Sequence, residues 1–137
     1  MTMLSAYVAA WPRRFCWHDS HCGHFALGWV QAATGRPALA AIPPVAGVRE
    51  WMRAVAAEGG MAAMVSRRLR CPLMAADQAQ PGDLVLMPGM LTGGALGVRL
   101  HAGVAALGES GRVEVVSLAR ALCAWPLAGL LADEVQP

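Results

Sequence analysis

The chain has 137 residues, of which 56% are hydrophobic and only 15% are charged, and its formal net charge is +2. This length suits one domain with a substantial core. The small net charge, without a basic block interleaved with aromatic residues, argues against a nucleic-acid-binding protein. No apolar run approaches the ~18 residues of a membrane-spanning helix. The high apolar content indicates that partner proteins cover part of the surface.

Residues 3–11 carry apolar side chains at helical spacing and predict a short amphipathic helix that ends at Pro12. This opening lacks a basic n-region and is a poor signal peptide, so we expect synthesis in the cytoplasm with reduced thiols. The four cysteines stand at positions 16, 22, 71 and 123. Their spacing is not that of a disulfide framework.

Residues 15–25 hold three of the four histidines and two of the four cysteines. From Cys22 to Ala33 the apolar residues follow a helical period, with Ser20 as the expected N-cap and Gly35 at the C-terminal end. Cys22 therefore falls in the first turn, where backbone N–H groups and the helix dipole favour a thiolate. Cys22 is thus either a nucleophile or a buried core cysteine.

The same stretch offers zinc ligands as an alternative. Their residue types suit zinc, but the spacing is not that of a known finger and no second Cys/His pair follows. We therefore expect no metal and no cofactor. The candidate ligands are Cys16, His18, His21, Cys22 and His24.

The remaining chain predicts helices first and a sheet afterwards. A proline-rich connection over residues 36–46 precedes two helices over 48–55 and 61–69, and a turn at Pro81-Gly82-Asp83, ordered by Asp83, opens the strand region. This order predicts an α+β domain over residues 1–137, with an arm over 1–14 and a tail over 128–137. The strands are expected at residues 84–87, 96–100, 103–107 and 112–118.

Four pieces of this sequence resemble the NlpC-type, papain-like cysteine peptidases, and more closely their small relatives encoded among phage and prophage tail genes. Together they span about residues 15–126. They are Phe15-x-Trp17 with Cys22-x-x-Phe25 and Ala33-Thr34-Gly35; Gly59 to Leu69; Pro81 to Val85; and Ala95-Leu96-Gly97-Val98 through Gly111 to Leu118 and Ala124-Trp125.

The resemblance implies a papain-like fold with Cys22 as nucleophile and a histidine base on a central strand. Two registers align this sequence with the peptidases' His-x-Gly-Val strand pattern. In the register that starts at His101, His101 is the base. In the register that starts at Ala95, alanine replaces the histidine and the site is inactive. The residue that orients the base would be Glu114 or Ser117. The sequence departs from the peptidases at His21, because they usually carry Asp immediately before the nucleophile.

The resemblance further implies a phage tail-tip or baseplate protein, located in the virion and made in the host cytoplasm. Its partners would be other tail proteins, through a face that includes some of Trp11, Pro43, Pro44 and residues 127–131. One alternative is an active peptidase that cleaves peptidoglycan with Cys22 and His101 and opens the cell wall during DNA delivery. A zinc-stapled structural module is the second alternative.

Overall fold

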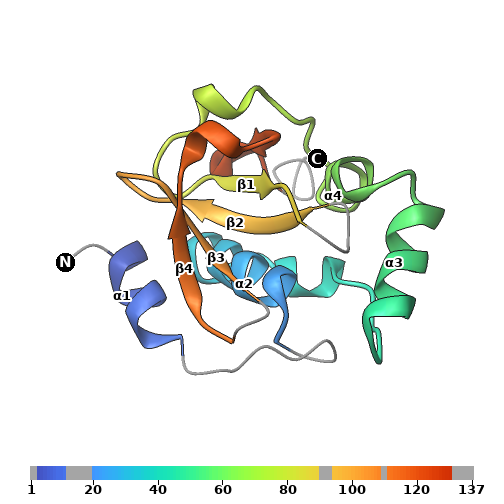
Figure 1. Cartoon of the computed structure of the whole chain (residues 1–137). Helices are drawn as coiled ribbons and strands as arrows, with labels where there is room; N and C mark the ends of the chain where they lie inside the picture. The colour runs from blue at the N-terminus through green and yellow to red at the C-terminus, as the bar shows by residue number, and fades with distance from the viewer. Residues whose placement is uncertain (1–2, 12–19, 90–93, 109–110, 131–137) are drawn as a thin grey trace.

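Helices precede the sheet along the chain, as expected for an α+β domain (Figure 1). The structure is a computed structural model, and it describes residues 3–11, 20–89, 94–108 and 111–130. The α-helices of this part are α1 (Met3–Ala10), α2 (Cys22–Thr34), α3 (Val48–Ala57) and α4 (Met61–Arg68). The strands are β1 (Leu84–Met87), β2 (Ala95–Arg99), β3 (Val104–Leu107), β4 (Val113–Val116) and β5 (Cys123–Trp125).

The five strands form one antiparallel sheet in the order β4-β3-β2-β1-β5. Four of them fall within two residues of the predicted segments, which confirms the period-2 and turn signals of the sequence. The fifth, β5, was not predicted, because three residues between Leu122 and Pro126 are too few to show alternation. It forms by pairing Leu86 with Cys123 and Leu84 with Trp125 along β1.

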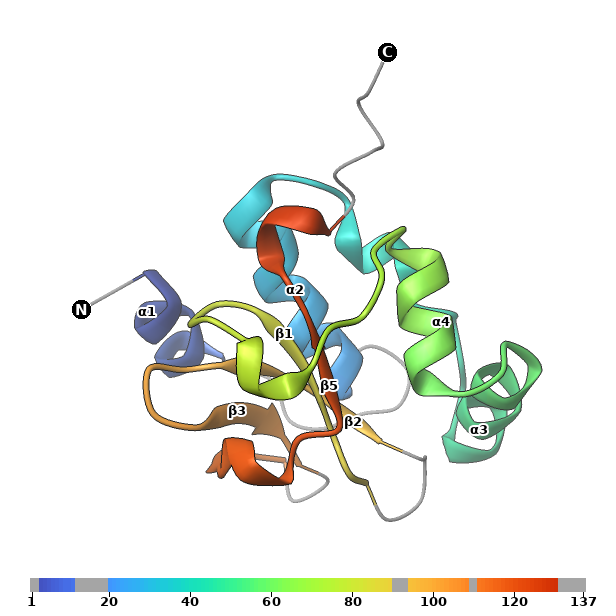
Figure 2. The same ribbon diagram turned by 90° about the horizontal axis from the view of Figure 1, so that it is seen from above.

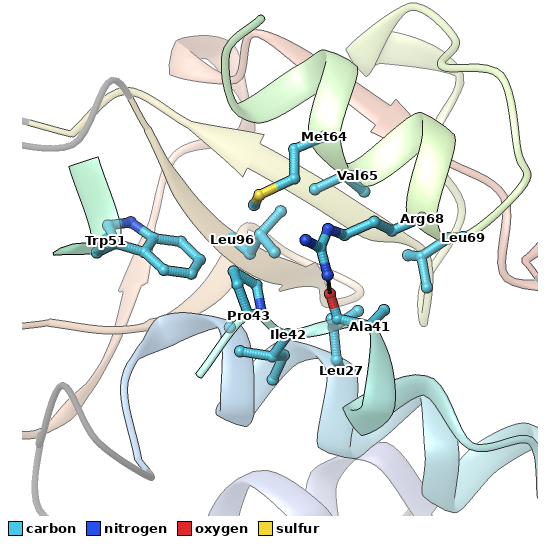
Figure 3. Close-up of a pocket in the computed structure, with 11 residues that line it drawn as sticks. Leu27, Ala41, Ile42, Pro43, Trp51, Met64, Val65, Arg68, Leu69 and Leu96 are labelled. Carbon is cyan, nitrogen blue, oxygen red and sulfur yellow. Dashed lines mark hydrogen bonds between the residues drawn. The ribbon is translucent and has the colours of Figure 1, made fainter. Parts of the chain in front are cut away.

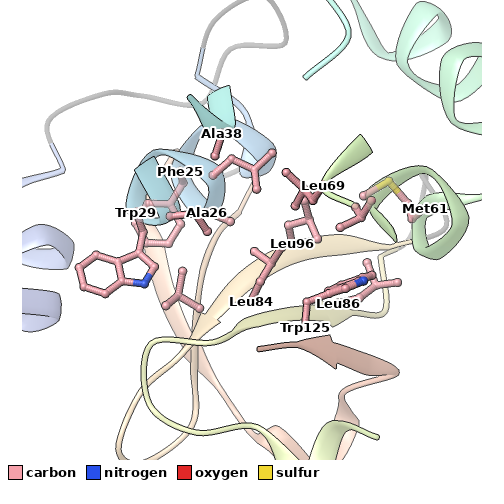
Figure 4. Close-up of a cluster of buried hydrophobic side chains, with 14 of the residues drawn as sticks. Phe25, Ala26, Trp29, Ala38, Met61, Leu69, Leu84, Leu86, Leu96 and Trp125 are labelled. Carbon is pink, nitrogen blue, oxygen red and sulfur yellow. The ribbon is translucent and has the colours of Figure 1, made fainter. Parts of the chain in front are cut away.

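Helix α2 covers one face of the sheet, and the two layers enclose the main core (Figures 1 and 4). Phe25, Ala26 and Val30 of α2 are fully buried against the strand residues Leu84 and Leu96. A smaller cluster on the other face joins Val85, Met87, Val104 and Ala124 to the segments around Ala79 and Leu118. Because both faces are covered, all four residues of β1 are buried.

Helix α1 docks on α2 through Tyr7. The Tyr7 hydroxyl donates a hydrogen bond to the Phe25 carbonyl at 2.8 Å, and burial raises the pKa of Tyr7 to about 12. A Cβ atom at Gly28 would lie 2.5 Å from this hydroxyl, so glycine allows the close approach of the two helices. Trp11 stacks edge-on against Phe25. The predicted N-terminal helix is thus confirmed, and it is packed rather than a detached arm.

Helices α3 and α4 stand at the opposite end of the molecule from α1, as Figures 1 and 2 show. They are joined by Gly59 and Gly60, both with positive φ, and tied by Arg67 and Arg68, whose guanidinium groups each bind the Glu58 carboxylate. The hydrogen bond from Arg68 is the main cause of the lowered pKa of Glu58. Arg68 also donates to the Ala41 carbonyl and so joins α4 to the proline-rich connection.

The face expected to meet partner proteins belongs in part to the core, although Pro44 and Ala128 are exposed and Leu131 lies outside the described residues. Leu130 is completely buried, Pro43 is buried, and Trp11 and Leu127 pack against the core cluster. Pro43 and Leu130 are therefore not available to the predicted face, because irregular segments can bury side chains without showing any periodicity. In the described residues the exposed large apolar side chains are Met3, Leu39, Met52, Leu73, Val115 and Leu122. No described helix is long and apolar enough to cross a membrane.

Gly97 is a position where the sheet accepts no side chain. A Cβ atom there would lie 2.7 Å from the Ala105 carbonyl oxygen and 2.7 Å from Val104 Cγ1, both on β3. We expect Gly97→Ala to lower the free energy of unfolding by about 1–3 kcal/mol, the usual cost of overpacking. Urea denaturation would measure it. Gly47→Ser is the control, because Gly47 caps α3 with open space around it and should tolerate serine.

Candidate functional site

Cys22 is the first residue of α2, at the end of the helix where backbone N–H groups concentrate positive charge. The helix begins where the sequence predicts, and the cysteine therefore has the position of an activated nucleophile. Its side chain, however, is only 6% exposed. Reactive cysteines lie in partly exposed surroundings, so the burial of Cys22 favours a structural thiol.

The cap of α2 is His21, and the expectation that Ser20 caps this helix was wrong. The His21 ring accepts a hydrogen bond from the Gly23 N–H at its Nδ1 atom, at 3.0 Å. The His24 ring accepts one from the His21 N–H at its own Nδ1 atom, at 3.2 Å. Two histidines thus form the reciprocal capping box that Ser or Thr and Glu form in other helices.

The His21 imidazole is completely buried between two rings. Its centroid lies 4.2 Å from that of His24 and 4.6 Å from that of Trp51 on α3. Burial, with the nearby His24 as a second cause, lowers the pKa of His21 to about 3. The cap is therefore a neutral imidazole at physiological pH, and it joins the start of α2 to α3.

This capping box also bears on the zinc alternative. Because both Nδ1 atoms accept backbone hydrogen bonds, the bonding pattern assigns the ring proton of each histidine to Nε2. A metal at Nε2 would require the other tautomer and would break the cap. Of the remaining candidate ligands, Cys16 and His18 lie outside the described residues. In the described part of the chain no three metal-ligating side chains cluster.

A small apolar pocket lies beside the start of α2 (Figure 3). Gly23 and Leu27 form its helical side, and Leu96 of β2 forms part of the opposite side. Arg68 reaches the pocket but is held by Glu58 and by the Ala41 carbonyl. The pocket has no catalytic polar side chain. It is lined by Gly23, Leu27, Ala41, Ile42, Pro43, Trp51, Met64, Val65, Arg68, Leu69 and Leu96.

His101 lies at the other end of the sheet from Cys22. The start of α2 meets the start of β2, since Gly23 and Leu96 line one pocket. Further along α2, Trp29 donates to the Gly82 carbonyl, and the Gly82 N–H donates to the Arg99 carbonyl at the end of β2. His101 follows in the exposed turn, six residues or about 20 Å of extended chain beyond Ala95.

The structure therefore does not bring the two predicted catalytic residues together. Ala95 opens β2 at the end of the sheet near Cys22, where the second register places the residue that replaces the base. Glu114 and Ser117, the candidates for the third role, are exposed on or just after the edge strand β4. Neither of these side chains completes a site with Cys22.

The capping role of His21 and His24 was missed at the level of sequence. The signal was available, because His21 stands immediately before the apolar helical pattern and His24 follows three residues later, which is the spacing of a capping box. Histidine is an uncommon residue for this role, and both histidines were interpreted as candidate zinc ligands instead. Asp83, in contrast, orders its turn as predicted: its carboxylate accepts from the Gln80 and Leu127 N–H groups.

Fold and site together define a small α+β domain with a buried cysteine at the start of a helix packed on an antiparallel sheet. A family model described as a domain of unknown function, DUF6950, matches residues 1–127. The chain therefore belongs to the DUF6950 family. No curated protein matches the chain.

Proposed function

We propose that this protein is a structural subunit of a phage tail tip or baseplate, built on a papain-like, NlpC-type fold whose catalytic site is degenerate. One observation carries the proposal: Cys22 begins a helix packed on the sheet beside the start of β2, and the residue that opens β2 is Ala95, which cannot act as a base. The tail assignment rests on the resemblance of the four sequence pieces to tail-gene relatives.

Gly97 supports the register that this proposal requires. Ala95-Leu96-Gly97-Val98 aligns with the peptidases' His-x-Gly-Val strand, and the glycine of that pattern falls where β3 leaves no room for a Cβ atom. In the register that starts at His101 the glycine would be Gly103, where a Cβ atom would also be too close to a neighbour, at 2.8 Å from the Val116 carbonyl oxygen. Gly103, however, lies in the turn before β3 with a φ of 98°, and not in a strand. The register that starts at Ala95 puts the glycine inside β2, and the peptidases' pattern lies on a strand.

The proposal predicts a slow reaction of Cys22 with iodoacetamide. The burial of the Cys22 thiol should keep its reaction at neutral pH no faster than that of Cys71 and Cys123, which are also buried. Peptide mapping after timed labelling of the native protein measures the three rates. Labelling in urea gives the reference in which burial is removed. Selective, rapid alkylation of Cys22 in the native protein would instead favour the peptidase.

Complementation distinguishes the tail role from an enzymatic one. In a phage that lacks this gene, both the wild-type chain and Cys22→Ala should restore infective particles, because the proposed role needs the fold and not the thiol. The matched control is Cys71→Ala, which removes a second buried cysteine. Restoration by Cys71→Ala but not by Cys22→Ala, with both proteins folded, would show that the Cys22 thiol itself is needed.

A further inference from the structure

Strand β4 is an edge strand of the sheet that the described residues form. It lies at the end of the order β4-β3-β2-β1-β5, paired on one side with β3 only. The other edge differs, because Met74 exchanges both of its backbone hydrogen bonds with Ala124 and so covers part of β5. An uncovered edge strand offers a row of backbone donors and acceptors to a further strand.

The hydrogen-bond ladder between β3 and β4 shows which backbone groups of β4 point away from β3. The Gly108 N–H donates to the Arg112 carbonyl, and Ala106 faces Glu114 in the same register. Because antiparallel residues alternate between bonded and non-bonded pairs, Arg112 and Glu114 turn their backbone groups toward β3. Val113 and Val115 therefore direct theirs outward, and no backbone bond of either is found with a described residue. The Val115 side chain is 61% exposed.

Two opposite charges flank the middle of this edge. Arg112 and Glu114 are both exposed, and alternation along the strand places them on one face of the sheet, on either side of Val113. Neither forms an ion pair within the part of the chain that the structure describes. The edge is thus complementary to itself: a copy turned by a two-fold axis through Val113 sets each arginine opposite the other copy's glutamate.

We propose that β4 is the contact strand of a two-fold dimer of this chain, with the two copies paired edge to edge about Val113. The outward groups of the two Val113 residues exchange hydrogen bonds, and the neighbouring Arg112–Glu114 pairs are non-bonded positions, where opposite side chains lie closest. Centring the axis on Glu114 would set two glutamates face to face, which is unfavourable. This surface is independent of the proposed tail role.

The contact is short, so the dimer should be weak in isolation and strengthened where copies are held close together. Gly111, with a φ of 88°, closes the turn that precedes β4. In the proposed register it stands opposite Val115 of the other copy and is the last residue of the ladder. Sedimentation velocity of the full chain over a rising concentration series is the measurement. We expect a concentration-dependent dimer for the wild type. A monomer at every concentration, up to the solubility limit, would overturn the proposal.

Variants test the strand and the register. Val115→Pro removes an outward N–H that β3 does not use, so it should abolish the dimer and leave the circular dichroism spectrum unchanged. Arg112→Glu and Glu114→Arg should each weaken association at least tenfold, and the double variant Arg112→Glu/Glu114→Arg should restore it, because the swapped charges still pair. A dimer unaffected by Val115→Pro, or single variants whose defects add in the double variant, would overturn the proposed pairing.

Discussion

Acidification below pH 6.5 should destabilise this protein steeply through one residue, His21. Its pKa is lowered to about 3 in the folded protein, whereas in the unfolded chain a histidine has its ordinary value near 6.5. Between these values the unfolded state binds a proton that the folded state does not. The His21 contribution is therefore complete above pH 6.5 and is lost as the pH falls, at about 1.4 kcal/mol per unit and about 5 kcal/mol by pH 3.

Urea unfolding at a series of pH values between 7 and 4 measures this slope. The matched variant is His21→Asn, because asparagine is a good N-cap but does not titrate in this range. It should be less stable than the wild type at pH 7, since the packing against Trp51 is lost, but its stability should depend less on pH. Equal slopes for the two proteins would show that His21 is not the buried neutral cap described above.

Removal of the Asp83 carboxylate should cause the second large loss of stability. Asp83 is only 7% exposed, and its two oxygens accept separate backbone bonds, from Gln80 and from Leu127, each at 2.8 Å. Asp83→Ala leaves both N–H groups without a partner, and each such group costs about 1–3 kcal/mol. We therefore expect a decrease of about 2–6 kcal/mol in the free energy of unfolding, measured in urea at pH 7.

The control for Asp83 is Asp77→Ala. Asp77 is an exposed acidic residue in a short 3-10 turn of the same connection, so its removal should change stability by less than about 0.5 kcal/mol. The difference between the two variants isolates the buried hydrogen bonds from the loss of a negative charge. If the two variants proved equally stable, Asp83 would not join the turn to the segment at Leu127.

The sequence predicted elements well where the pattern was long or clearly punctuated. Helix α2, with a full apolar stripe and a terminal glycine, and the strands set between Pro-Gly or Gly-rich turns fall where expected. It missed β5, whose three residues become a strand only through their pairing with β1. It also misplaced Leu130, because no local pattern reveals that an irregular segment enters a core.

The candidate site could be predicted only in part. The place of Cys22 follows from local helix signals, so the sequence sufficed for it. Its relation to His101 or Ala95 depends on how β2 aligns with α2, which is a tertiary property. The two candidate registers, which start six residues apart at Ala95 and His101, are equally compatible with the local pattern. The pocket shared by Gly23 and Leu96 and the hydrogen bond from Trp29 to Gly82 show that the start of β2, and not His101, lies at the Cys22 end of α2.

The proposed tail role, which is the central claim, is tested most directly by the protein composition of tails purified from a phage whose genome carries this gene. Tails prepared from particles of the phage that encodes this chain would be digested and quantified by mass spectrometry. We predict that the chain is present at a fixed ratio to the other tail-tip proteins and stays at that ratio in the Cys22→Ala phage. Its absence from intact tails, although the protein is made during infection, would contradict a structural role.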